Sequence, residues 1–260
     1  GVNGNSILMT FQKIDIMTDA TMWTFDNIVN AFNMMTGDAG LLSAAKVSVM
    51  SYLLILCIGT PLGMLFSYYI YKKLPLSGAF RIILFLPSII SAIVMVTIFQ
   101  FFVERAVPEV VKVITGGKII EGLMENTKTR FATIIFYNIW VGFGTSVLMY
   151  ANGMSGINRE MVESAHLDGA TGLKEFWYIT IPVVYPTLST FLITGVAGIF
   201  TNQINLYSFY GGSAPEKVQT YGYYLYRRTQ GAASRSEYPL LAAMGLLLTC
   251  IVVPLTFAVK

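Results

Sequence analysis

Long stretches without a single Asp, Glu, Lys or Arg set the hydrophobic pattern of this chain beyond residue 46. A helix needs about 20 apolar residues to cross the hydrocarbon core of a bilayer, and each of these stretches is long enough. Isolated strands are excluded, because their backbone groups would stay unpaired in lipid. The pattern therefore predicts an all-α membrane protein, a polytopic helical bundle. Its five visible spans are expected at residues 47–71, 82–103, 131–158, 186–210 and 238–259.

The composition agrees with a membrane protein. Hydrophobic residues make up 55% of the chain and charged residues 12%, whereas a soluble domain carries about 25% charged residues. The net charge of +3 is weak and scattered along the chain, so it gives no indication of nucleic-acid binding. Residues 1–40 differ from the rest, since the aspartates spread through them exclude a membrane span.

One polar segment, residues 159–182, interrupts the apolar pattern between the third and fourth expected spans. Asn158 is a typical N-cap residue, so a first helix is expected over 159–168. Gly169 follows at the place where a helix C-terminus favours a positive φ. A second short helix is expected over 172–181, closed by the proline that follows it. The segment thus predicts a helix, a glycine turn and another helix.

The spacing within this segment carries a family resemblance. Glu163-Ser164-Ala165 is followed, at unchanged distances, by Gly169 and by the sequence ITIP (179–182). This order resembles the EAA loop of ABC importer permeases, with serine and isoleucine standing where the family pattern has alanine and leucine. The sequences LDGAT and IWVGF nearby are most similar to the carbohydrate branch of that family. An ordinary surface helix-turn-helix is the alternative, but it does not require this spacing.

The resemblance implies that residues 159–182 form a cytoplasmic loop that couples the permease to an ATPase subunit. It gives Glu163 the role of an exposed anionic contact and Gly169 that of a tight turn. The alternative for each residue is helix capping or solvation. The residues expected to make the coupling are Glu163, Ser164, Ala165, Leu167, Asp168, Gly169 and Pro182.

The resemblance also divides the chain into two parts. Residues 41–260 are expected to form the permease core. Residues 1–40 are expected to be an extracytoplasmic segment that follows a sixth span located before residue 1, since the sequence WTFDNIVNAF is similar to the segment that precedes the core of sugar permeases. Counting Lys and Arg alone favours the opposite orientation. The loop is nevertheless placed in the cytoplasm, because it must meet an ATPase there.

Neutral polar residues inside the spans are candidates for a substrate path, because each needs a partner where water is absent. An amide cluster is expected in the outer half of the helix after the loop, and counting from the loop puts Asn202 at a sugar contact of the resembling family. The same count puts residues 141 and 142 at a second contact. Hydrogen bonding between helices is the alternative, and for Asn202 both interpretations stay open. The expected path residues are Asn202, Gln203, Asn205, Val141, Gly142 and Trp140.

The sequence contains no motif for ATP binding or catalysis. It lacks the pattern G-x-x-x-x-G-K-[ST], and His166 has no second histidine or cysteine nearby to complete a metal site. We therefore expect a transport subunit rather than an enzyme, with no cofactor of its own. His166 is expected to be a solvated loop residue.

The function that the resemblance implies is that of a permease subunit in an ATP-driven importer. It would move a saccharide, an oligosaccharide, across the bacterial cytoplasmic membrane by alternating access. The implied partners are a second homologous permease, two ATPase subunits that bind ATP and Mg, an extracytoplasmic solute-binding protein and the lipid bilayer. A permease for another small solute, such as an amino acid, phosphate or osmolyte, is one alternative, and a non-transporting membrane scaffold is another. An anionic substrate favours a buried cation, which the expected spans lack.

Overall fold

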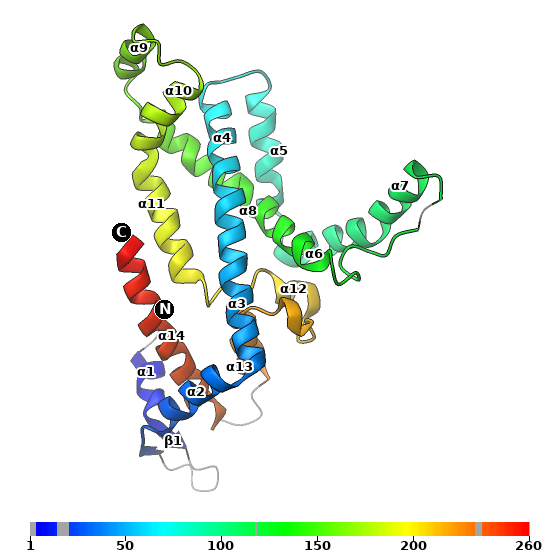
Figure 1. Ribbon diagram of the computed structural model, residues 1–260, viewed down its shortest axis with the longest axis vertical. Coiled ribbons are helices and arrows are strands. Elements are labelled where there is room, and N and C mark those ends of the chain that lie inside the picture. The colour runs from blue at the N-terminus through cyan, green and yellow to red at the C-terminus, as the bar shows by residue number, and fades with distance from the viewer. Residues whose placement is uncertain (1–3, 15–20, 118, 232–235, 260) are drawn as a thin grey trace. The chain divides into compact units, whose positions relative to one another are not determined.

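The computed structural model describes residues 4–14, 21–117, 119–231 and 236–259 (Figure 1). The chain divides into two compact units, and each is considered by itself: Leu53–Thr194, and Gly1–Tyr52 together with Gly195–Lys260. Among the described residues, the only strands are β1 (Gln12–Ile14) and β2 (Thr21–Trp23), which form a short antiparallel hairpin. Helices make up the other elements, which confirms the expected all-α class.

The helices range from single turns to membrane-crossing lengths. Three of the short elements, η1 to η3, are π-helical turns set between α-helices, and η4 is a 3₁₀ turn. In chain order the helices are α1 (Gly4–Thr10), α2 (Asp26–Gly37), α3 (Ala39–Leu54), η1 (Ile55–Gly59), α4 (Thr60–Tyr71), α5 (Ser77–Ile89), α6 (Ala92–Phe101), η2 (Phe102–Ala106), α7 (Val107–Ile114), α8 (Arg130–Ser155), α9 (Arg159–Leu167), α10 (Leu173–Glu175), η3 (Phe176–Thr180), α11 (Ile181–Gly198), α12 (Leu206–Tyr210), η4 (Glu216–Val218), α13 (Tyr221–Gln230) and α14 (Glu237–Val259).

Several of these elements join into stretches long and apolar enough to cross a membrane. Within the described residues there are four such stretches, and a fifth if a bent pair of helices counts as one span. The polytopic helical architecture expected from the sequence is therefore confirmed. The four stretches are Ala39–Tyr71, Arg130–Ser155, Leu173–Gly198 and Glu237–Val259, and the bent pair is Ser77–Ile89 with Ala92–Ile114.

The expected second span, 82–103, is not one continuous helix. Its two parts, α5 and α6, meet at an angle of 106°. Helix α5 ends at Ile89, two residues after Pro87, and Ile90 is extended with ψ 144°. Pro87 has no N–H to donate and its ring crowds the preceding turn, which weakens the helix just before the break. The span expected at 82–103 is therefore interrupted, because the chain stops being helical at Ile90.

The expected fourth span, 186–210, and the separate loop helix 172–181 were both misplaced. The helix instead runs from Leu173 through Pro182 and ends at Gly198. The π-helical turn η3 precedes the proline, and Ile181 N donates to Phe176 O there. This wider register accommodates a residue that lacks an N–H, so Pro182 lies inside the helix rather than closing it.

Helix α8 is the centre of the unit Leu53–Thr194, where α4 and α5 pack against it. Ser67 on α4 is fully buried, and its hydroxyl donates to the carbonyl oxygen of Val147 on α8 over 2.9 Å. Helix α5 comes so near to Gly144 that an added Cβ there would lie 2.1 Å from the carbonyl oxygen of Leu84. Small residues thus let the backbones of these helices meet, as is usual in membranes.

Helix α14 has the corresponding place in the other unit, where α1 and α2 pack against it. Its apolar cluster includes Ala31, Leu41 and Met244. The backbone N–H of Tyr221, at the start of α13, donates to the buried hydroxyl of Ser48 on α3 over 2.9 Å. This hydrogen bond joins a segment after the fourth span to the first span.

We expect the substitution Gly144→Ala to destabilise the protein, because the new methyl group has no room beside Leu84. Overpacking of this kind costs about 1–3 kcal/mol in the free energy of unfolding. The measurement heats the detergent-solubilised protein and finds, by size-exclusion chromatography, the temperature at which half of it is still monodisperse. This temperature should be lower for the variant than for the wild type.

The matched control is Gly142→Ala on the same helix. Nothing lies within 4 Å of a Cβ at Gly142. Alanine is also the better helix former by about 1 kcal/mol, so this variant should be as stable as the wild type or more stable. Equal losses in both variants would show that crowding against α5 is not the cause.

Candidate functional site

Helix α9 begins as the sequence predicts. The side-chain oxygen of Asn158 accepts a hydrogen bond from the backbone N–H of Glu160 over 2.9 Å, which confirms Asn158 as the N-cap. The helix ends at Leu167, one residue before the expected boundary, and Asp168 is its C-cap. The polar sequence therefore forms a short capped helix in the unit Leu53–Thr194.

A glycine turn follows this helix. Gly169 has a φ of 78°, and the N–H of Ala170 donates to the carbonyl oxygen of Ala165 over 2.8 Å. This six-residue closure is the Schellman arrangement, which requires a left-handed residue at the position of Gly169. Gly172 also has a positive φ, of 58°, immediately before α10. The expected tight turn at Gly169 is thus confirmed, and it has a second glycine beside it.

The side chains expected to make the coupling lie mostly on the outside of α9. Glu163 is 68% exposed and Leu167 is 90% exposed, whereas Val162 is buried in the apolar cluster of the unit. Arg159 and Glu163 form an exposed ion pair at 3.4 Å, which contributes little to stability. The helix therefore has one anchored face and one open face that carries a carboxylate and an apolar side chain.

The other expected coupling residues divide between this helix and the next span. Ser164 and Asp168 are exposed and Ala165 is half-buried, all at the C-terminal end of α9 or directly after it. Pro182 is exposed too, but it lies beyond α10 and η3, in the first turn of α11. The structure thus keeps the loop residues together and puts Pro182 in the membrane-crossing helix.

A buried ion cluster joins this loop to the first span. The side chain of Glu175 in α10 is 1% exposed, and the Lys72 ammonium lies 2.5 Å from its Oε1 and 2.7 Å from its Oε2. The Nε2 atom of His166 lies 2.8 Å from the same Oε2. His166 is exposed, as the expectation of a solvated residue requires, but its ring also reaches a buried carboxylate across the glycine turn, which was not expected.

Sequence reasoning missed this cluster, although one signal was available. Lys72 directly follows an uncharged run, and Glu175 directly precedes another. Charges at the ends of two spans that pack together are natural partners, but the pattern does not say which spans pack. Within the described residues, no group of three or more His, Cys, Asp or Glu side chains could hold a metal ion.

The expected path residues on α8 lie near the middle of that helix. The ring of Trp140 packs 6.0 Å from Phe99 and 6.4 Å from Tyr137, measured between centroids. Val141 is half-buried, and Gly142 is exposed with open space around it. This part of α8 therefore combines an aromatic stack with an accessible stretch of backbone.

The expected amide cluster lies outside any membrane-crossing helix, because α11 ends at Gly198. The Oδ1 atom of Asn202 accepts from the N–H of Ile204 over 2.8 Å, and its carbonyl oxygen accepts from the Thr220 hydroxyl over 2.9 Å. Asn205 has a φ of 59° and directly precedes α12. The placement within a helix was wrong: the turn residues here interrupt the helix.

The amides and the α8 residues belong to different units. Asn202, Asn205 and the half-buried Gln203 lie in the unit that contains α14. Trp140, with the two residues after it, lies in Leu53–Thr194. Each group is therefore a separate candidate for contact with a solute.

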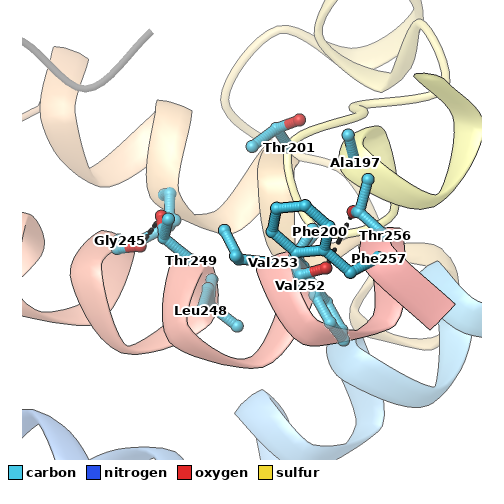
Figure 2. A pocket seen from close by; sticks show the side chains of 11 residues that line it. Ala197, Phe200, Thr201, Gly245, Leu248, Thr249, Val252, Val253, Thr256 and Phe257 are labelled. Atoms are coloured by element: carbon cyan, nitrogen blue, oxygen red, sulfur yellow. Dashed lines mark hydrogen bonds between the residues drawn. The ribbon is translucent and has the colours of Figure 1, made fainter. Parts of the chain in front are cut away.

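A pocket of about 320 Å³ lies beside α14 in the unit that contains the amides (Figure 2). Phe200, Leu248 and Val252 are among the apolar side chains that line it. The hydroxyls of Thr249 and Thr256 donate to carbonyl oxygens of their own helix. Because the hydroxyls of Thr249 and Thr256 are already paired within the helix and the lining is mostly apolar, this pocket is suited to an apolar chain and not to a polyhydroxyl solute.

Comparison with known proteins gives the family. Residues 59–260 match the family described as binding-protein-dependent transport system inner membrane component. The chain is similar to the multiple sugar-binding transport system permease protein MsmF of Streptococcus mutans, with 23% identity over 89% of this chain and 81% of the relative. It is also similar to the arabinooligosaccharides transport system permease protein AraP of Bacillus subtilis, with 27% identity over 74% of this chain and 62% of the relative.

A solved structure shares the fold. It is the crystal structure of a bacterial ABC transporter involved in the import of the acidic polysaccharide alginate. One of its chains superposes with a TM-score of 0.80 at 21% identity, covering 98% of this chain and 86% of that one. The family match covers α9, the glycine turn and most of the membrane-crossing helices. The chain therefore belongs to the family of binding-protein-dependent transport system inner membrane components, and it is a multi-pass transport subunit rather than an enzyme.

Proposed function

We propose that this chain is a permease subunit of an ATP-driven importer that carries a saccharide, in particular an oligosaccharide, across the bacterial cytoplasmic membrane. It acts with a second homologous permease, two ATPase subunits and an extracytoplasmic solute-binding protein. ATP and Mg bind to the ATPase subunits. The transport step is alternating access, in which the spans open to one side of the membrane at a time.

The open face of α9 is the observation that carries this proposal. Leu167 is 90% exposed on a short polar helix, and the Glu163 carboxylate is exposed on the same helix. A single exposed leucine is ordinary on a protein surface, so the inference of a contact also depends on the EAA-like spacing of this segment. In a family whose members belong to binding-protein-dependent transport systems, the partner we infer is the ATPase subunit in the cytoplasm.

The attachment of α9 supports a role as a lever. Val162 anchors the helix in a cluster that also contains Met64 of α4 and Val184 of α11. After the glycine turn, the chain continues from Leu173 to Gly198 as one helical stretch. Through the contacts of Val162, a displacement of the docked helix can be passed to α4 and α11, which lie in membrane-crossing stretches.

Saccharide transport is supported by the relatives and by the character of the expected path. The names of MsmF and AraP refer to sugars. The path residues on this chain are neutral: an indole at Trp140, backbone at Gly142 and an amide at Asn202. Amides and aromatic faces suit an uncharged polyhydroxyl solute. An anionic solute would call for a buried cation or aimed helix N-termini, and the parts 47–71, 131–155, 176–198 and 238–259 of the observed stretches have no Lys or Arg.

The docking role predicts that Leu167→Asp and Glu163→Ala weaken the association with the ATPase subunit. We expect the amount of ATPase that co-purifies with the permease to fall at least about fivefold for Leu167→Asp, because a charge replaces the apolar contact. The control is Glu109→Ala, which removes an exposed carboxylate from α7, outside the loop. Wild-type co-purification by both loop variants would contradict docking through α9.

The substrate role predicts that both Asn202→Ala and Asn202→Asp reduce uptake into proteoliposomes that hold the complete importer. Asn202→Asp keeps the oxygen that accepts from Ile204 N but loses the amide donor. The solutes are an equimolar mixture of labelled arabinotriose, galactotriose and maltotriose, with glycerol 3-phosphate tested separately. Wild-type uptake by Asn202→Asp would show that Asn202 only shapes the turn. Uptake of glycerol 3-phosphate alone would replace the saccharide assignment by an anionic solute.

A further inference from the structure

The buried carboxylate of Glu175 depends on its partners for stability as an anion. Its side chain is 1% exposed and lies in the first turn of a membrane-crossing stretch, at Leu173–Gly198. A carboxylate in such a place is stable as an anion only if cations and hydrogen-bond donors replace the lost water. Lys72 supplies an ammonium to both carboxylate oxygens, and His166 adds a contact to Oε2.

The three residues of this cluster come from three different elements. Lys72 directly follows α4, His166 lies in the last turn of α9, and Glu175 ends α10. Figure 1 shows α9 and α10 at the same end of the unit as the end of α4. The cluster therefore joins the end of one span, the exposed helix and the start of another span at a single point.

Further contacts hold Lys72 and its neighbours in place. The Lys72 ammonium lies 5.6 Å from the ring centroid of Tyr68 and 5.7 Å from that of Tyr71. The hydroxyl of Tyr68 donates to the carbonyl oxygen of Gly172 over 3.1 Å, and its ring packs 5.1 Å from that of Phe176. The link between α4 and α10 is thus made by charge, hydrogen bond and ring packing together.

The backbone on either side of α9 is poorly suited to transmit a force by itself. Gly156 lies just before the helix, and the positive-φ residues Gly169 and Gly172 lie just after it. Glycine leaves the backbone more conformational freedom than any other residue. Of the residues in α9, Val162 is the one that is buried. A side-chain connection is therefore needed if movement of α9 is to reach the spans without loss.

We propose that Lys72, Glu175 and His166 are positioning residues that lock α9 to α4 and to the Leu173–Gly198 helix, so that the docked helix and both spans move as one body. None of the three makes the contact with the ATPase, which the proposed function gives to Glu163 and Leu167. The proposal rests on that proposed function, because the lock matters only if α9 is the lever.

The first test measures the lock without any transported solute. Spin labels at Glu160→Cys on α9 and Leu74→Cys after α4, in a background with Cys57→Ser and Cys250→Ser, report the distance between the two elements in the assembled importer. We expect one narrow distance distribution that is the same with and without ATP and Mg. Glu175→Gln and Lys72→Met should broaden it, whereas Lys72→Arg, which keeps the charge, should not.

The second test measures coupling in the same complex. ATP hydrolysis is compared with and without the binding protein loaded from the arabinotriose, galactotriose and maltotriose mixture. Glu175→Gln and Lys72→Met should retain the bound ATPase subunits, but the stimulation of ATP hydrolysis by the loaded binding protein should fall at least about fivefold. Fivefold is the lower end of typical coupling between sites. Lys72→Arg, which keeps the charge and leaves the contact between His166 and Glu175 in place, should retain the stimulation. A residue needed only for folding would not give complexes that assemble with the ATPase subunits but are uncoupled.

Several results would overturn the lock. A narrow distance distribution and normal stimulation in Glu175→Gln and Lys72→Met would do so. If the variants at Glu175 fail to assemble, His166→Leu decides, since the His166 side chain is 42% exposed and its replacement leaves the Lys72–Glu175 ion pair in place. Full stimulation in His166→Leu would then reject the proposal.

Failure of the lock is distinguishable from failure of the proposed function. If Leu167→Asp loses the ATPase subunit while Glu175→Gln stays coupled, α9 is the docking element and only the lock is rejected. If Leu167→Asp and Glu163→Ala both keep the ATPase at the wild-type level, the docking role of α9 is wrong. The proposed role of Lys72, Glu175 and His166 is then rejected with it, because it requires a docked α9.

Discussion

The absence of water in the bilayer core is the constraint on which this structure depends. Every backbone group that crosses the membrane has to find its partner within the chain, so the spans are helices. The same constraint governs side chains: the Ser67 hydroxyl bonds to Val147 across two helices, and the threonines of α14 bond to their own backbone. Glu175 is the extreme case, because a buried carboxylate needs both Lys72 and His166.

This constraint also explains how the loop can be both exposed and firmly placed. A short polar helix such as α9 has little apolar surface to bury, so its position depends on a few strong contacts. Val162 supplies an apolar anchor and His166 a polar one, and both leave the opposite face open. The exposed Leu167 and Glu163 thus lie on a helix whose orientation is determined by the contacts of Val162 and His166 on its opposite face.

The break after Gly198 gives the amides a different setting from the one expected. Within a span, Asn202 would have to find a partner across a helix interface. In the turn that the structure shows, its side chain holds the backbone of Ile204 and its carbonyl oxygen receives the Thr220 hydroxyl. The segment 199–205 is therefore a connection between α11 and α12 whose shape is fixed by hydrogen bonds, and the amide groups lie at its surface.

The sequence by itself determined the helical membrane class, the approximate positions of the spans, the cap at Asn158 and the turn at Gly169, because these depend on hydrophobic runs and on local backbone preferences. It misjudged the helix through Pro182 and the break at Ile90, since a π-helical turn can absorb one proline while another lies close to a break. Only the tertiary structure decided that Lys72, His166 and Glu175 meet. Lys72 and Glu175 are 103 positions apart, and their pairing depends on which spans pack together. His166 lies nine residues before Glu175 and reaches it across the glycine turn.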